Sequence, residues 1–299
     1  MKVAVVSGAD AAFFPLLKDL VVSVRERIPA AEVDLAILDA GLTDDQREQL
    51  TPLVDRIARP DWDLRPAGSA PDYIKCFDSR PMLPKYLPGY DIYVWIDADA
   101  WVQDRAAVDL LIQGASNRQC AVSPELHPGY EPVYSNLNIR YRRFGRVKIY
   151  FWAHEKYGRA FGERAMRAYA WRPLLNSGVF ALHRDAPHWE AWIDSYRRAL
   201  RGDPTIWVNQ VAFNHAVYSR GLEAEYLPAW CNWVCARGLP AFNPATGEFV
   251  EPYVPHQRIG ILHMAWNTKH GTHELATTTG GKVRRSLRRP ADQKEKSNA

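Results

Sequence analysis

The chain has 299 residues, with 38 Lys and Arg against 34 Asp and Glu, and a formal net charge of +4. This length allows one large core, and the composition is that of an ordinary globular protein. The positive excess comes largely from residues 282–289, so the rest of the chain is close to neutral. A nucleic-acid-binding protein would spread Lys and Arg over one face, and we therefore expect no nucleic-acid partner.

Cysteine usage and hydropathy narrow the class of protein further. The four cysteines form no Cys-x-x-Cys pair and lack the His spacing of a zinc site, which predicts buried free thiols in a reducing compartment. The chain starts directly with a strand-like run rather than a signal peptide, and its apolar stretches are too short to span a bilayer. We therefore expect a cytoplasmic protein.

The first sixty residues alternate between strand and helix patterns. Residues 2–6 form a short apolar run that predicts a buried parallel strand, and residues 13–28 carry apolar side chains at helical spacing. A second strand is expected over 33–38, followed by a helix that opens with the capping pattern of residues 43–46. This order predicts an α/β fold with a Rossmann-like, open, doubly wound sheet and helices on both faces.

The rest of the chain is expected to complete one domain over residues 1–279. The elements predicted there are an interrupted helix over 73–86, strands over 90–96, 178–182, 224–227 and 258–262, and helices over 187–200 and 206–218.

Two segments stand apart from this pattern. Residues at about 124–170 are rich in proline, then in basic and aromatic residues, and predict a lid-like insertion. Residues 280–299 are basic and polar, and we expect them to be disordered. Two alternatives stay open for this tail: it remains solvated, or it contacts the anionic inner face of a membrane.

The motif with the clearest chemistry is Asp97-Ala98-Asp99, directly after the apolar strand over 90–96. Two carboxylates at i, i+2 leave an extended strand end on the same side. Hard oxygen ligands suit Mg²⁺ or Mn²⁺, which keep coordination places open for phosphate oxygens. The alternative is a pair of solvated turn aspartates, which the position at a strand end makes less attractive.

A second group of polar residues follows the last predicted strand. His263 could add a nitrogen ligand to a cation that already has two carboxylates, and Lys269 could meet phosphate as a point charge. Taken alone, His263 would be a core histidine more often than a metal ligand.

Taken together, several segments resemble glycosyltransferase family 8, the retaining GT-A enzymes that include bacterial lipooligosaccharide galactosyltransferases and glycogenins. The similarity runs from residue 2 to about residue 269. It rests on the stretch 38–43, on Arg80 ahead of Asp97, on an Asn-x-Gly segment at 176–178, on Asn209-Gln210 in place of an Asp-Gln pair, and on His263 and Lys269 at the spacing of His-x-x-Gly-x-x-Lys.

The sequence also departs from the family pattern. Trp266 replaces the glycine of the last motif, which changes how closely the backbone can approach a diphosphate. Asn209 replaces an aspartate and carries no charge. Asp10 is all that remains of an acidic pair that contacts uracil.

The resemblance implies a GT-A fold and transfer of a hexose from a UDP-sugar to a hydroxyl of a saccharide or lipid-linked acceptor, with retention. It implies that Mn²⁺ or Mg²⁺ is held by Asp97, Asp99 and His263. The sugar would be oriented by Arg80, Asn176, Asn209 and Gln210. The rest of the donor would meet Ser7, Gly8, Asp10, Ala98, Gly178 and Lys269. Lys75, which lies near Arg80 in sequence, is either a second cation that contacts the donor or a surface charge.

Two other functions remain open at this stage. A sugar nucleotidyltransferase would need a glycine-rich basic loop after the first strand, and residues 7–10 carry no basic side chain. A non-catalytic nucleotide-sugar or glycan-binding protein would have no need of a three-ligand cation site. Trp230, Trp233 and Trp266 are either a stacking platform for an acceptor sugar or core residues.

Overall fold

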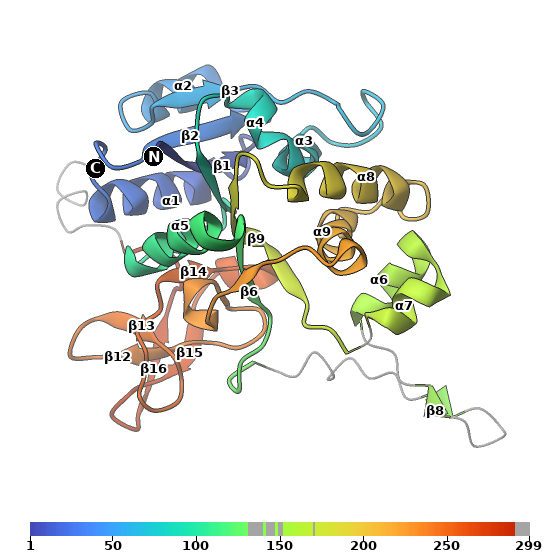
Figure 1. Cartoon of the computed structure of the whole chain (residues 1–299). Coiled ribbons are helices and arrows are strands. Elements are labelled where there is room, and N and C mark those ends of the chain that lie inside the picture. Colours follow the sequence, from blue (N-terminus) through green and yellow to red (C-terminus); the bar gives the residue numbers. More distant parts are fainter. Residues whose placement is uncertain (131–139, 142–146, 149–151, 170, 291–299) are drawn as a thin grey trace.

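A central seven-stranded sheet forms the middle layer of the protein (Figure 1). The computed structural model describes residues 1–130, 140–141, 147–148, 152–169 and 171–290. The strands run in the order β10-β6-β9-β4-β1-β2-β3. Their bounds are β1 Val3–Ala9, β2 Asp34–Asp39, β3 Arg56–Ala58, β4 Ile92–Ile96, β6 Cys120–Pro124, β9 Leu175–His183 and β10 Glu225–Tyr226.

Helices cover both faces of this sheet, and α1 and α5 lie on the opposite face from α8 and α9. The α-helices are α1 Phe14–Arg27, α2 Asp44–Leu50, α3 Ile74–Ser79, α4 Leu83–Tyr86, α5 Ala106–Arg118, α6 Trp152–Phe161, α7 Glu163–Ala168, α8 His188–Leu200 and α9 Val208–Arg220. Three short 3₁₀ turns are η1 Arg80–Met82, η2 Ala229–Cys231 and η3 Trp266–Lys269.

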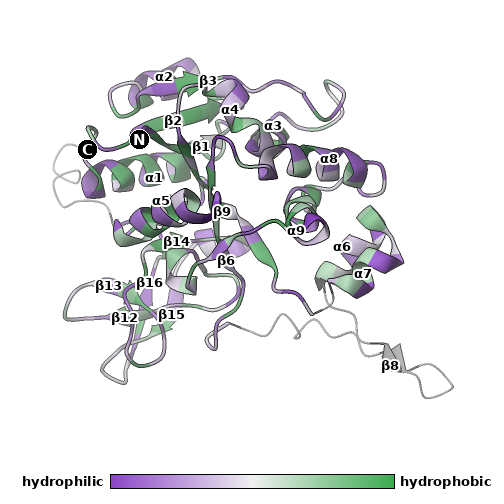
Figure 2. Cartoon of the chain, in the orientation of Figure 1, coloured by the Kyte–Doolittle hydropathy of each residue, from purple (hydrophilic) through white to green (hydrophobic). Residues whose placement is uncertain are grey.

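Strand β1 shows why the apolar N-terminal run becomes a central strand. All seven of its residues are buried, and it pairs in parallel with both β2 and β4. Because successive side chains point to opposite faces, Ala4 and Val6 pack toward α8 and α9, while Val3 and Val5 pack toward α1 and α5. The hydropathy colouring in Figure 2 shows the same apolar strands between amphipathic helices.

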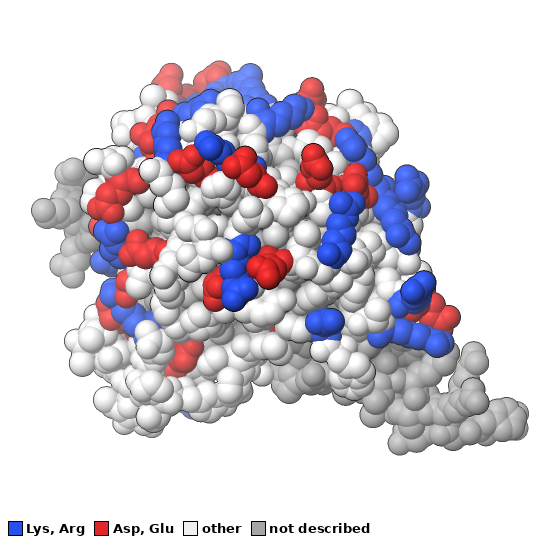
Figure 3. All heavy atoms as spheres, viewed as in Figure 1, with Lys and Arg blue, Asp and Glu red and all other residues white. Residues whose placement is uncertain are grey.

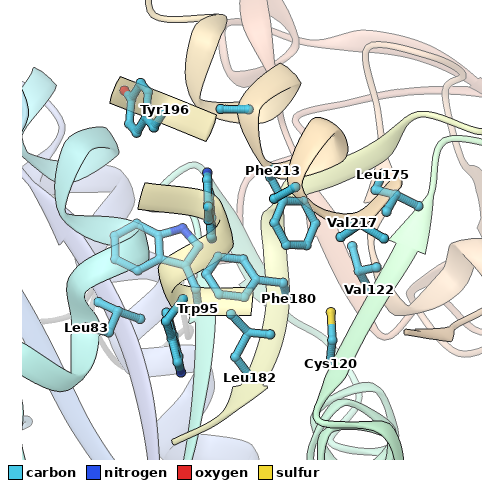
Figure 4. Packing of buried hydrophobic residues seen from close by; sticks show 14 of the residues in the cluster. Leu83, Trp95, Cys120, Val122, Leu175, Phe180, Leu182, Tyr196, Phe213 and Val217 are labelled. Atoms are coloured by element: carbon cyan, nitrogen blue, oxygen red, sulfur yellow. The ribbon is translucent and has the colours of Figure 1, made fainter. Parts of the chain in front are cut away.

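The larger core lies between the sheet and helices α8 and α9 (Figure 4). Phe180 of β9 packs edge to face against Trp192 of α8, with ring centroids 5.3 Å apart, and lies 6.0 Å from Phe213 of α9. Burial of such large aromatic side chains dominates the stability of a core. This packing fixes the positions of β9 and α9, and both elements contribute polar side chains to the candidate functional site.

Small sheets from the C-terminal third pack at one side of the main sheet (Figure 1). Strand β14 lies between β11 and β5. Two hairpins, β12-β13 and β15-β16, complete this part, and β7 and β8 form a separate pair. The bounds are β5 Ala100–Val102, β7 Arg140–Tyr141, β8 Val147–Lys148, β11 Trp233–Val234, β12 Ala241–Asn243, β13 Glu248–Val250, β14 Ile261–His263, β15 His273–Ala276 and β16 Lys282–Arg285.

Most of the predicted elements are confirmed, with small shifts at their ends. The helix over 73–86 is interrupted at Pro81 by η1, and Thr43 with Gln46 forms the predicted capping box of α2. Helix α5 and strand β6 had no counterpart in the predicted elements. Much of the expected insertion, including residues 131–139 and 142–146, lies outside the described residues, so its predicted role as a lid stays a prediction.

The prediction that the tail is disordered from residue 280 is wrong for residues 280–290. Strand β16 pairs with β15, and Leu287 is buried, with its carbonyl accepting a hydrogen bond from Trp101 Nε1 at 2.9 Å. Arg288 donates to Asp19 of α1 at 2.6 and 2.8 Å, and Arg289 pairs with Glu26. Residues 291–299 lie outside the described part of the chain. Arg288 and Arg289 therefore have acidic partners within the fold, whereas Arg285 lies over the Phe242 ring.

Two further features of the described residues are the distribution of surface charge and the length of the apolar helices. On the face drawn in Figure 3, acidic and basic side chains lie interspersed rather than gathered into one basic stripe. Within the described residues, the structure has no helix that is both long and apolar enough to cross a membrane.

Replacing Leu287 with alanine tests whether the tail belongs to the fold. Because Leu287 is a fully buried leucine, Leu287→Ala should lower the free energy of unfolding by about 2–5 kcal/mol in urea denaturation. The matched control is Lys282→Ala in the same tail, which removes only an exposed ion pair with Glu274 and should change stability by less than about 1 kcal/mol. Equal stability of Leu287→Ala and the unaltered protein would contradict the packing of this tail.

Candidate functional site

Two carboxylates follow strand β4 at its carboxyl end, in the middle of the main sheet. Asp97 follows the last residue of β4, and its backbone N–H donates to Gly178 O of β9 at 2.8 Å. The chain then turns, with Ala100 N donating to Asp97 O at 2.9 Å, and leaves as β5. This turn directs Asp97 and Asp99 toward the same space.

His263 reaches the acids because β14 pairs with β5. The pairing is antiparallel and places His263 opposite Ala100, the residue after Asp99. Met264 N donates to Asp99 O at 2.8 Å and holds the register. His263 Nε2 lies 3.5 Å from Asp99 Oδ1 and 3.8 Å from Asp97 Oδ2. The imidazole therefore faces both carboxylates, although it lies far from them in sequence.

These three residues fit a divalent cation. One ligand atom from each lies within 4.8 Å of the others. Asn232 Nδ2 donates to Asn176 Oδ1 at 3.1 Å, so its Oδ1 is the atom that faces His263 Nδ1, also at 3.1 Å. An amide oxygen can only accept, so Nδ1 carries a proton, and in the neutral imidazole the lone pair on Nε2 would face the acids. Two carboxylates and this nitrogen form a ligand set suited to Mn²⁺ or Mg²⁺.

Each carboxylate also has a cationic partner. Arg80 is ion-paired with Asp97, and Lys269 Nζ lies 2.6 Å from Asp99 Oδ2. Burial raises the pKa of Asp97 above its ordinary value despite these charges. Burial also acts on Asp99, but the hydrogen bond and charge of His263 and the charge of Lys269 hold the pKa of Asp99 well below its usual range. Burial lowers the pKa of His263, but Asp99 and Asp97 outweigh it and raise that pKa.

Gly178 forms the floor under this cluster. A methyl group added at Gly178 would lie 2.4 Å from His263 Cε1 and 2.7 Å from Asp97 Oδ2. Both distances are far below van der Waals contact, so any side chain here would displace the imidazole or the carboxylate. The site therefore requires glycine at this position for space rather than for backbone conformation.

A second polar group adjoins the acids. Arg80 donates to Ser177 O at 3.2 Å and to Asn209 Oδ1 at 3.3 Å, and Asn209 Nδ2 donates to Phe77 O at 2.6 Å. Asn209 is buried and holds Arg80 and α3 in place. The replacement of a charged residue by asparagine at this position is therefore compatible with a role in positioning Arg80.

Glu125 joins the remaining polar side chains. Its carboxylate accepts from Asn176 Nδ2 at 2.8 Å, from Gln210 Nε2 at 3.1 Å and from Arg237 Nε at 2.6 Å. Because a carboxylate accepts hydrogen bonds, both amides must turn their nitrogen atoms toward it. The side-chain oxygen of Gln210 is then the polar atom left to face a ligand.

Except for Asn232, the site residues described above line one cavity of about 750 Å³. This volume is in the range of small-molecule sites. Gly8, Asp10 and Phe13 lie at one end of the cavity, and the two acids with His263 and Lys269 line its middle. The polar side chains at the other end are Glu125, Asn176, Asn209, Gln210 and Arg237. Ala98, Arg80 and Gly178 also line it. The structure thus brings together nearly all of the residues that the sequence predicted.

Some predicted site residues lie elsewhere. Lys75 pairs with Asp72 at 3.1 Å and lies over the Trp62 ring, away from the residues that line the cavity. Ser7 is fully buried in β1, on the strand rather than on the cavity wall. Trp233 is buried and Trp230 packs against the core, so a three-tryptophan platform is wrong, and of the three only Trp266 lines the cavity.

Three residues of the site, Glu125, Asn232 and Arg237, had no predicted role. Glu125 falls at the start of a segment that the sequence assigned to an insertion, and Asn232 lies between the tryptophans that suggested a platform. Only their position in the fold shows that they share a hydrogen-bonded network with Asn176. No spacing within the sequence predicted that contact.

Comparison with known proteins identifies the fold. No protein-family model matches the chain, and no curated protein matches its sequence. The solved structure of the WbbM bifunctional glycosyltransferase is similar with a TM-score of 0.56 and 16% identity, covering 89% of this chain and 46% of that chain. The galactosyltransferase LgtC, solved with donor and acceptor sugar analogues, is similar with a TM-score of 0.51 and 14% identity, covering 89% of both chains. The chain thus spans just under half of the WbbM protein, and the expected GT-A fold is confirmed.

Gly178→Ala tests the geometry of the acidic cluster. The added methyl group cannot coexist with the present positions of His263 and Asp97, so we expect Mn²⁺ affinity to fall at least tenfold, measured by electron paramagnetic resonance titration. The control is Gly158→Ala in α6, whose methyl group would meet only the flexible Met166 side chain at 3.3 Å. Mn²⁺ affinity equal to that of the control would show that the cluster does not hold the cation.

Proposed function

We propose that the protein is a metal-dependent glycosyltransferase that transfers a hexose from a UDP-sugar to a hydroxyl of a saccharide or lipid-linked saccharide, with retention of configuration. The observation that carries this proposal is that one cavity contains two sets of residues. The first set is Asp97, Asp99 and His263, and the second comprises the polar side chains of Glu125, Asn176, Asn209, Gln210 and Arg237. The similarity in fold to WbbM and LgtC supports it. Uracil as the base follows from the family resemblance of the sequence.

The carboxylates and imidazole would hold Mn²⁺ or Mg²⁺, which when bound supplies Lewis-acid stabilisation to the departing diphosphate. Lys269 Nζ lies 2.6 Å from Asp99 and is placed to meet phosphate charge beside the same acids. Gly178 and Ala98 line the cavity beside this cluster, where the donor would bind. Gly8 and Asp10, at the end of β1, would then meet the nucleoside.

The hexose would occupy the other end of the cavity. Arg80 is held by Asp97, Ser177 and Asn209, so its guanidinium is fixed beside the point where the sugar and diphosphate meet. The Gln210 amide presents its oxygen because Glu125 binds its nitrogen. An uncharged oxygen in this position can stabilise developing positive charge at the anomeric carbon without forming a stable covalent bond.

Retention without a strong nucleophile favours attack by the acceptor on the face that the diphosphate leaves. Gln210 is neutral, and Glu125 accepts three hydrogen bonds that lower its reactivity as a nucleophile. Detection of a glycosyl group covalently attached to either residue would replace this mechanism with a double displacement.

Ion pairs within the fold engage part of the basic tail. Lys282, Arg288 and Arg289 pair with Glu274, Asp19 and Glu26 of the same chain. Attraction to anionic lipid depends on unpaired basic charge near the surface. Three of the five basic side chains in residues 282–289 are thus neutralised within the fold, and the proposed reaction does not depend on a membrane contact of this tail.

Nucleotide binding should depend on Asp99. With UDP and Mn²⁺ at about 100 times the dissociation constant, the unfolding free energy should rise by about 2.7 kcal/mol, seen as an increase in Tm. Asp99→Asn should abolish this increase, because it removes a cation ligand. Asp194→Asn, an exposed acid of α8 paired with Arg220, is the control and should keep the increase. If Asp99→Asn binds UDP and Mn²⁺ as well as the control, the proposed cation site is wrong.

Catalysis is tested by release of UDP from a panel of UDP-hexoses in the presence of Mn²⁺ and saccharide acceptors. A shift in Tm with UDP, but no turnover of any UDP-hexose, would favour a nucleotide-sugar-binding protein over an enzyme. Formation of a UDP-sugar from UTP and a sugar phosphate would favour a nucleotidyltransferase instead.

Glu125→Gln should separate catalysis from donor binding. A glutamine at this position can donate as well as accept, so it no longer fixes the orientation of the Gln210 amide. We expect kcat to fall about 10–100-fold, as is typical for loss of a group that orients a site residue, while the Tm increase with UDP and Mn²⁺ falls much less, because Asp97 and Asp99 still supply two cation ligands. An unchanged kcat would exclude this role for Glu125.

A further inference from the structure

Trp266 adopts a backbone conformation that tryptophan rarely takes. Its φ is +61°, in the left-handed region that favours glycine, and a large side chain there costs on the order of 1 kcal/mol or more. The indole is also 52% exposed, so burial of its surface does not offset much of this cost. Such a residue suggests a ligand that the free protein does not contain.

A second indole meets Trp266 at the cavity wall. Trp207 lies at the N-cap of α9, and its ring centroid is 5.5 Å from that of Trp266, with the planes tilted by 51°. Both residues line the cavity. The two rings come from distant parts of the chain and together form an aromatic surface that we call the Trp207–Trp266 pair.

The position of this pair relates it to both halves of the site. Trp266 stands between His263 and Lys269 in sequence, so it lies next to the part of the cavity that would take the diphosphate. Trp207 directly precedes the turn of α9 that carries Gln210, at the part that would take the hexose. The pair therefore borders the junction between leaving group and sugar, which is where an acceptor must arrive in a same-face transfer.

We propose that the Trp207–Trp266 pair binds the pyranose ring of the acceptor that presents the attacking hydroxyl. This inference rests on the proposed function and adds to it the chemical class of the acceptor: a saccharide with a six-membered ring, not a simple alcohol or an amino-acid hydroxyl. One face of a pyranose is lined by C–H groups, which pack on an indole ring, while its hydroxyls remain free to contact the polar groups below. The exposed side of Trp266 leaves space for that ring.

The groups assigned to the donor are the charged and polar residues of the cavity and Phe13, and they do not include the Trp207–Trp266 pair. Phosphate charge is matched by Lys269 and the cation site, the hexose hydroxyls by the polar group around Glu125, and the nucleoside by the end of β1 with Phe13, which is 39% exposed. Phe13 lies under Lys269 Nζ at 4.9 Å and offers its own ring at that end of the cavity. An aromatic pair beside the sugar end is therefore available for the second substrate.

The test measures binding of methyl β-D-galactopyranoside, methyl β-D-glucopyranoside and methyl β-lactoside to the full chain saturated with UDP and Mn²⁺, by saturation-transfer NMR. At least one glycoside should bind, and glucitol, which has the hydroxyls but no ring, should not. Trp266→Gly should weaken glycoside binding about tenfold, the scale of an aromatic contact of this kind. Glycine tolerates φ of +61°, so this variant removes the indole and adds no backbone strain.

Two further variants complete the design. Trp266→Phe keeps a ring and should retain most of the glycoside affinity. Trp171→Ala removes a tryptophan that is 79% exposed and lies outside the cavity lining, and it should match the unaltered protein.

Each outcome decides between the hypotheses. Loss of glycoside binding in Trp266→Gly, with the Tm increase from UDP and Mn²⁺ retained, supports the acceptor assignment. Glycoside affinity unchanged in Trp266→Gly, or no glycoside bound by the unaltered protein while UDP is bound, overturns it. Loss of the UDP-dependent increase in Trp266→Gly assigns the indole to the donor instead. Absence of that increase in the unaltered protein contradicts the proposed function itself.

Discussion

The antiparallel pairing of β14 with β5 is the contact on which the site depends. Strand β5 begins directly after Asp99, and the register places His263 opposite Ala100. A shift of this register by one residue would turn His263 to the opposite face of the small sheet, because side chains alternate along a strand. The packing of Trp233, Leu262 and Met264 in the core of the small sheets holds this register. The proposed cation site therefore depends on a long-range strand pairing rather than on a local motif.

Buried charge imposes the second constraint on the site. Asp97 and Asp99 are largely removed from water, and an isolated carboxylate there would be costly. The positive charges of Arg80 and Lys269 neutralise these carboxylates. The two ion pairs also hold η1 and η3 next to the carboxyl end of β4. In the proposed function, a phosphate group that enters beside Asp99 would compete for Lys269, and donor binding would then be linked to the position of η3 by the same ion pair. Trp266 lies in η3 together with Lys269, so the position of the Trp207–Trp266 pair depends on the ion pair between Lys269 and Asp99.

The sequence predicted the parts of the fold whose patterns are local. Each of these patterns is contained in a short stretch of sequence: the apolar runs of β1 and β4, the capping box at Thr43 and the proline break at Pro81. The ordered tail was missed because the basic residues near Leu287 dominate local composition, whereas the carbonyl of Leu287 is bound by Trp101, far away in the chain. Glu125 was missed for the same reason: its partners Asn176, Gln210 and Arg237 come from three separate segments. His263 was predicted only because its spacing to Lys269 resembles a family motif.

Hydrogen-bond direction connects the two ends of the cavity. Glu125 only accepts, so Asn176 turns its nitrogen to Glu125 and its oxygen to the N–H of Gly178 at 2.9 Å and to Asn232. Asn232 must then turn its own oxygen to His263 Nδ1, which orients the imidazole with Nε2 toward the acids. The same Glu125 carboxylate sets the amide of Gln210. One buried acid, neutralised by Arg237, thereby orients both the nitrogen suited to a cation and the oxygen suited to a sugar. Such a network has a single polarity, and reversing any amide in it would set two donors or two acceptors against each other.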